Sequence, residues 1–152
     1  MTSRLIVGVG NTFRRDDAAG LAAATRLRGL LPGAIRVLAQ EGDLASLLDD
    51  WRGADAVIVV DATSSGSEPG TIRRYDARER PLPSVFSRSS THSLGIAEAM
   101  ELARALGRLP ERIVVFGIEG RDFSTGEGLS SDVDAAVDEV VRRITAEATG
   151  NA

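Results

Sequence analysis

The sequence predicts an α/β fold: a doubly wound, three-layer α/β/α domain around a mostly parallel sheet of about five strands. Two observations predict it. Short apolar runs typical of buried strands alternate with segments whose apolar residues recur at helical spacing. The chain has 152 residues, of which 43% are hydrophobic and 26% charged, a balance typical of a globular protein. We therefore expect a single domain over residues 1–152, with helices on both faces of the sheet.

The first half of the chain alternates strand, helix, strand and helix. Residues 5–9 form a continuous apolar run, which indicates a strand buried on both faces. Residues 18–31 carry apolar side chains at helical spacing, and a Pro-Gly pair is expected to stop this helix. Residues 35–39 are a second strand candidate, and residues 44–51 place leucines and a tryptophan on one helical face.

The second half continues the alternation. Residues 56–60 are β-branched and apolar, the strongest strand signal in the chain, and the run ends at an aspartate. Residues 71–75 mix apolar side chains with arginines, which is typical of an edge strand. Residues 94–106 predict a helix, residues 113–118 a buried strand and residues 132–148 a final helix with valines along one stripe.

Composition excludes several classes of protein. The formal net charge is −4 and the pI about 5.1, so we expect no nucleic-acid partner. There is no Cys, which removes disulfides, thiolate metal centres and a cysteine nucleophile. No apolar run approaches the roughly 18 residues that a membrane span needs, and the apolar stretch near the N-terminus is too short for a signal peptide. We expect a soluble, cytoplasmic protein without a membrane partner, most simply a monomer.

Four polar residues lie at or near the ends of the predicted strands, where such sheets bind ligands. Asp16 and Asp17 come after the first strand, Asp61 after the third strand, and His92 before the third long helix. In a flavodoxin-like strand order the first and third strands are neighbours, so the acidic pair and Asp61 share one rim, with His92 facing them. Oxygen ligands from the acidic pair and Asp61, with a nitrogen ligand from His92, suit a first-row divalent metal. The same side chains could instead position a water for general-base catalysis.

Each of these residues also has a purely structural interpretation. Asp16 or Asp17 would cap a helix N-terminus, where a carboxylate interacts favourably with the helix dipole. Asp61 would close an Asx turn, and a lone histidine such as His92 is often a structural or surface residue.

Known nucleotide and nucleophile motifs do not fit. Gly8-Val9-Gly10 begins like a dinucleotide-binding loop, but Phe13 stands where that fingerprint needs its third glycine, and two acids follow. Carboxylates at this point would repel a pyrophosphate. The chain also lacks a Walker A loop and the Gly-x-Ser-x-Gly elbow of many serine hydrolases.

Taken together, four segments resemble the nickel-iron hydrogenase maturation proteases. The family shows a strand ending in Gly-x-Gly-Asn before an acidic pair, an Asp after an apolar strand, a His followed by Leu-Gly, and a Gly-Leu-Ser/Thr step into the last helix. The matching segments here are 5–11 with 15–17 and Gly20, 59–62, 90–95, and 115–119 with 128–130. They occur in the family's order and span nearly the whole chain.

The resemblance implies a phosphorylase/hydrolase-like fold and an endopeptidase that senses nickel in the precursor of a hydrogenase large subunit. It implies removal of a C-terminal peptide from that partner after nickel has been inserted. The family's metal-binding positions correspond to Asp17, Asp61 and His92, which are our candidates for both metal ligands and catalytic residues. No tightly bound cofactor is expected, because the substrate supplies the nickel, although Cd or Zn would substitute in crystals.

The sequence departs from the family at two points. Ala18 stands where the family has a glycine, which would strain a turn that needs positive φ. Glu41-Gly42-Asp43 replaces a Gly-Gly-Thr step, which leaves the choice of substrate open. Two alternatives stay open as well: a non-catalytic metal- or ligand-binding module of flavodoxin-like shape, and a peptidyl-tRNA hydrolase-like enzyme, whose first strand has a similar Gly-Asn ending.

Overall fold

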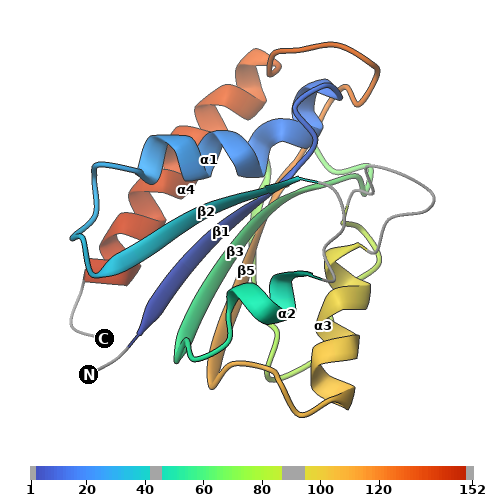
Figure 1. The fold of residues 1–152 in the computed structure, drawn as a ribbon. Coiled ribbons are helices and arrows are strands. Elements are labelled where there is room, and N and C mark those ends of the chain that lie inside the picture. The colour runs from blue at the N-terminus through green and yellow to red at the C-terminus, as the bar shows by residue number, and fades with distance from the viewer. Residues whose placement is uncertain (1–2, 42–45, 87–94, 150–152) are drawn as a thin grey trace.

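The computed structural model describes residues 3–41, 46–86 and 95–149. Its centre is a five-stranded sheet in the order β2-β1-β3-β5-β4 (Figure 1). Four strands are parallel, and β4 pairs with β5 in the antiparallel direction at the edge. The expected doubly wound α/β domain with a mostly parallel sheet is confirmed, as are the arginine-bearing edge strand and the adjacency of β1 and β3. The strands are β1 (Arg4–Gly10), β2 (Ile35–Glu41), β3 (Ala56–Thr63), β4 (Ile72–Asp76) and β5 (Arg112–Glu119).

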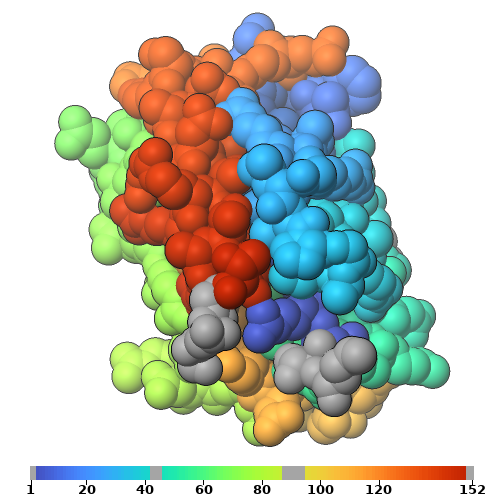
Figure 2. Space-filling view, turned by 90° about the vertical axis from the view of Figure 1, so that its left-hand side faces the viewer, coloured from blue at the N-terminus to red at the C-terminus, as the bar shows by residue number. Residues whose placement is uncertain are grey.

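Helices cover both faces of the sheet. On one face α1 and α4 pack side by side, as Figure 2 shows for the blue and red segments. On the other face lie α2 and α3, next to the strands in Figure 1. The helices are α1 (Ala19–Leu27), α2 (Leu47–Asp50), α3 (Ile96–Ala105) and α4 (Ser131–Thr149).

Alternate residues of each buried strand supply the two hydrophobic cores. In β1, Leu5 and Val7 belong to the core beneath α2 and α3, whereas Ile6 belongs to the core beneath α1 and α4. In β3, Val59 and Val60 divide in the same way. This two-sided burial explains why the strands appear in the sequence as unbroken apolar runs.

Several boundaries differ from the prediction. The first helix ends at Leu27 rather than at residue 31, because Gly29 turns the chain with a φ of 88°. The third and fifth strands run on through Asp61 and Glu119, since parallel pairing continues to the Thr63–Glu119 register whatever the side chains are. The start of the helix expected at 44–51 lies partly outside the described residues.

No helix in the described parts of the chain is both long and apolar enough to span a membrane.

Candidate active site

A single turn of 3₁₀ helix, η1 (Arg15–Ala18), joins β1 to α1 at the carboxyl end of the sheet. It carries Asp16 and Asp17, whose side chains are both buried, with exposed fractions of 0% and 1%. A buried carboxylate requires either hydrogen-bond donors or a nearby cation to remain ionised. The two neighbours have different surroundings.

Close backbone packing places this turn beside the ends of β1 and β3. A Cβ at Gly20, in the first turn of α1, would lie 2.2 Å from the Val60 carbonyl oxygen and 2.4 Å from that of Val9. A Cβ at Gly8 would lie 2.0 Å from the Gly20 carbonyl oxygen. The glycines of the first strand therefore serve close contact between helix and sheet, and the peptide before Asp61 touches the helix that follows Asp17.

Asp61 lies inside β3 and is buried, with 3% exposed. Burial raises the pKa of its carboxyl group well above the usual range, and the negative charge of Asp17 raises it further. The Ala62 amide donates a hydrogen bond of 2.8 Å to Asp61 Oδ1 and lowers this pKa in part. The prediction that Asp17 and Asp61 share one rim is confirmed, because β1 and β3 are neighbours in the sheet and η1 contacts β3.

Asp16 has a structural role that the sequence did not indicate. Its Oδ2 accepts hydrogen bonds from the amides of Arg121 and Asp122 at 2.8 and 2.9 Å and from Ser130 Oγ at 2.8 Å. Its Oδ1 accepts one from the Ser130 amide at 2.7 Å. The interpretation of Asp16 or Asp17 as a helix cap is half right: both lie in the first turn of η1, but neither η1 nor α1 has a side-chain capping hydrogen bond. Asp16 instead ties η1 to the loop before α4.

Glu119 is a fourth buried carboxylate, and it is not among the residues predicted from the sequence. It lies at the end of β5 with 4% exposed. Its Oε1 accepts hydrogen bonds from Thr63 Oγ1 and Ser65 Oγ, and its Oε2 accepts one from the Ser65 amide, all at 2.8 Å. The segment directly after Asp61 is thereby fixed. The available signal was that Glu119 follows an apolar strand in the same way that Asp61 does.

His92 lies outside the described residues, so its position stays a prediction. The described residues that come before this segment are attached close to Asp61: Phe86 bridges to Thr63, and the Ser64 amide donates to the Val85 carbonyl at 2.7 Å. Within residues 3–41, 46–86 and 95–149, no group of three or more His, Cys, Asp or Glu side chains is placed to hold a metal.

The two departures from the family pattern have different outcomes. Ala18 adopts a φ of −86°, so the strain expected there is absent. The positive φ falls instead on Arg15, at 46°. Glu41 is the last residue of β2, and its Oε1 accepts hydrogen bonds from the amide and the hydroxyl of Thr12, both at 3.0 Å. Gly42 and Asp43 lie outside the described residues.

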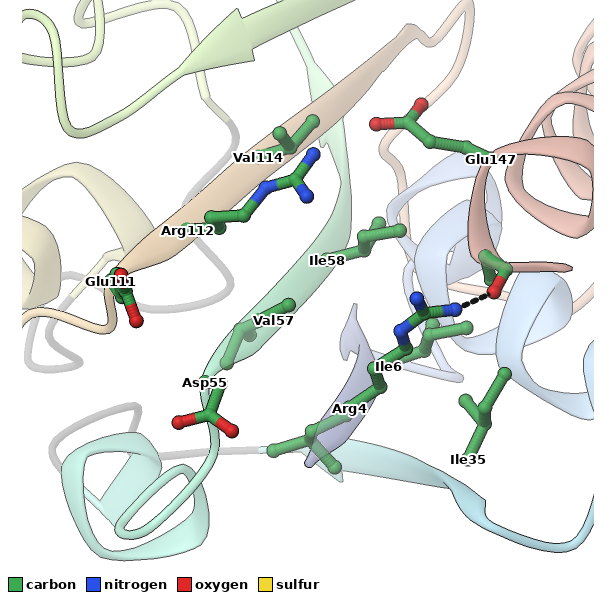
Figure 3. A pocket seen from close by; sticks show the side chains of 13 residues that line it. Arg4, Ile6, Ile35, Asp55, Val57, Ile58, Glu111, Arg112, Val114 and Glu147 are labelled. Carbon is green, nitrogen blue, oxygen red and sulfur yellow. Dashed lines mark hydrogen bonds between the residues drawn. The ribbon is translucent and has the colours of Figure 1, made fainter. Parts of the chain in front are cut away.

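A cavity of about 510 Å³ opens at the opposite, amino end of the sheet (Figure 3). Arg4 and Arg112 lie on either side of Ala56 in the strand register, and both line the cavity together with Ile6 and Ile58. Arg4 donates a hydrogen bond to the carbonyl of Ala148 across the cavity. Asp16, Asp17 and Asp61 do not line this cavity.

The model of a protein family described as hydrogenase maturation protease matches residues 42–147. The hydrogenase 2 maturation protease of Escherichia coli K12 is 29% identical over 148 residues, covering 93% of this chain and 88% of the relative. A hydrogenase maturation protease of Methanocaldococcus jannaschii, so far assigned only provisionally, is 31% identical over 151 residues, covering 94% of both chains.

Solved structures agree with the sequence comparisons. The hydrogenase maturating endopeptidase HybD from Escherichia coli superposes with a TM-score of 0.81 at 25% identity, covering 99% of this chain and 94% of that one. The [NiFe] hydrogenase maturation protease HybD from Thermococcus kodakarensis superposes with a TM-score of 0.72 at 26% identity, covering 95% and 97%. With the family model, the relatives and the fold in agreement, this chain belongs to the hydrogenase maturation protease family.

Proposed function

We propose that this protein is an endopeptidase that removes a C-terminal peptide from the precursor of a nickel-iron hydrogenase large subunit, and that it acts when the precursor carries nickel. The observation that carries the proposal is the buried Asp17–Asp61 pair at the carboxyl end of the sheet in a chain of this family. The family assignment also favours a protease over a peptidyl-tRNA hydrolase-like enzyme.

The chemistry of the pair supports binding of substrate nickel. Burial raises the pKa of the Asp61 carboxyl group, and the charge of Asp17 raises it further, because two buried carboxyl groups repel each other when both are ionised. A divalent cation between them removes that repulsion, and oxygen ligands with one imidazole suit nickel. We assign the imidazole to His92. The metal belongs to the precursor, so its binding would bring the scissile bond to the site.

Hydrolysis adds water across the scissile C–N bond, so one group must take a proton from the water and the leaving amine must gain one. Asp17 and Asp61 are the carboxyl groups of the pair that can carry this proton. A nickel-bound water or a nickel-polarised carbonyl would lower the same barrier.

Mass spectrometry of a nickel-loaded precursor incubated with the protein tests the proposal. We expect loss of the C-terminal peptide with the wild type and no loss with nickel-free precursor. Asp17→Asn and His92→Ala should reduce the rate by more than about 100-fold, the scale of removing a group that acts on the reacting atoms. Asp138→Asn is the matched control, because the Asp138 side chain is 68% exposed on α4.

Two results would contradict the proposal. One is an intact precursor tail with the wild type in the presence of nickel. The other is cleavage at the wild-type rate by Asp17→Asn. If the protein binds nickel-loaded precursor but never cleaves it, the non-catalytic binding module is the better description.

A further inference from the structure

Phe13 is a large apolar side chain left in solvent beside the candidate site. It is 61% exposed, on the loop between β1 and η1. The other exposed large apolar residues in the described part of the chain are Leu30, just after α1, and Leu102 and Leu106, in α3 and at its end. The protein has only four Phe, one Trp and one Tyr, so an aromatic ring in solvent is unusual within it.

The backbone of Phe13 is held rigidly although its ring is exposed. The Phe13 amide donates to Asn11 Oδ1 at 2.9 Å, and its carbonyl accepts from the Gly126 amide at 2.9 Å. Thr12, next in the loop, is tied to Glu41 at the end of β2 by two hydrogen bonds of 3.0 Å. The ring therefore projects from a fixed tip rather than from a mobile loop.

The base of this tip is the backbone of Asp17. The Asn11 amide donates to the Asp17 carbonyl at 3.3 Å, and the Asp17 amide donates to the Arg14 carbonyl at 3.0 Å. Phe13 and Asp17 thus belong to one hydrogen-bonded loop. A partner that contacts this loop therefore meets the Phe13 ring within four residues of Asp17.

We propose that Phe13 is a docking residue for the folded hydrogenase precursor, inserting into an apolar recess on the precursor near its C-terminal peptide. This rests on the function proposed above. With 61% of its surface in solvent, the Phe13 ring is accessible to a partner, and the precursor would supply the apolar contacts that the ring lacks. Rigid aromatic side chains on fixed backbone lose little entropy on binding and dominate protein interfaces.

Steady-state cleavage of nickel-loaded precursor by Phe13→Ala, Phe13→Leu and Leu30→Ala tests the docking role. We expect Phe13→Ala to raise KM about tenfold, typical of losing an interface anchor, with kcat within about twofold. Phe13→Leu should recover most of the loss. Leu30→Ala is the matched control, because Leu30 is 58% exposed but lies beyond the far end of α1, and its KM should not change. Unfolding midpoints of all three variants should match the wild type.

A KM for Phe13→Ala within twofold of the wild type overturns the proposal, as does a fall in kcat at unchanged KM. If Asp17→Asn is inactive while Phe13→Ala is normal, docking fails and the proposed function stands. If the wild type does not cleave the precursor, the proposed function fails and the docking role fails with it.

Discussion

Asp16 and Asp17 are adjacent in the sequence, identical in type and both buried, yet the structure uses them differently. Asp16 accepts four hydrogen bonds, all from residues 121–130. Asp17 instead lies near Asp61, and its charge adds to the rise in the pKa of Asp61 that burial causes. One carboxylate thus holds a loop in place, while the other forms a like-charged pair.

The comparison shows that burial alone does not identify a functional acid. Four hydrogen bonds satisfy the buried oxygens of Asp16, so this group adds to the stability of the fold. A buried pair of carboxyl groups lowers stability at neutral pH unless a cation or a proton enters. Such a cost is typical of sites kept for function.

The largest loss of stability is expected from Gly20→Ala, which would displace the turn that carries both Asp16 and Asp17. The added Cβ would lie 2.2 and 2.4 Å from two strand carbonyl oxygens, so α1 and η1 must move away from the sheet. We expect a loss of about 3 kcal/mol or more in the free energy of unfolding, measured by urea denaturation. Gly33→Ala is the control, since a Cβ at Gly33 would have no neighbouring atom within 4 Å, and it should stay within about 1 kcal/mol. Equal stability of the two variants would contradict the close packing of α1 on the sheet.

A smaller loss is expected from Asp16→Asn. The amide keeps one acceptor oxygen but turns an NH₂ group toward the backbone donors of Arg121 and Asp122. Leaving such donors unsatisfied should lower the free energy of unfolding by about 2–3 kcal/mol. Hydrogen exchange of residues 121–130 should become faster, because Asp16 anchors that loop. Unchanged exchange there, with activity lost, would instead make Asp16 part of the chemistry.

Asp61→Asn should change the free energy of unfolding least, and should raise it rather than lower it. A raised pKa means that folded protein binds the proton more tightly than unfolded protein, so wild-type stability falls as pH rises through the folded-state pKa. Asparagine cannot ionise and can still accept the Ala62 hydrogen bond. With EDTA present, the variant should be about 0.5–2 kcal/mol more stable at pH 7.5, and the gain should shrink toward pH 4.5.

Asp122→Asn provides the matching control for that measurement. Hydrogen bonds from the Ser124 hydroxyl and amide lower the pKa of Asp122, so its replacement should reduce stability at neutral pH rather than increase it. A gain for Asp61→Asn that grows as the pH is lowered would contradict the assignment of Asp61 as the buried, raised-pKa member of the pair.

The sequence was sufficient to predict the order of the helices and strands. It was also sufficient to predict that Asp17 and Asp61 lie on the same edge of the sheet. Apolar periodicity is local, and right-handed parallel crossovers leave few ways to arrange such strands. The C-terminal ends of β3 and β5 were predicted too early, because strand pairing continues through Asp61 and Glu119 after the apolar run has ended. The end of α1 was missed because Gly29 turns the chain before the apolar spacing stops.

By itself the sequence determined the α/β class, the strand that precedes each acid and the family resemblance that the comparisons confirmed. Only the tertiary structure decided which neighbouring aspartate is structural, since Asp16's partners lie more than 100 residues away in the chain. It also decided that the first-strand glycines serve helix packing, because that depends on the distance between two backbones. Hydrogen-bond donors and close contacts from distant segments leave no local pattern in the sequence, and for that reason they had to be seen in the fold.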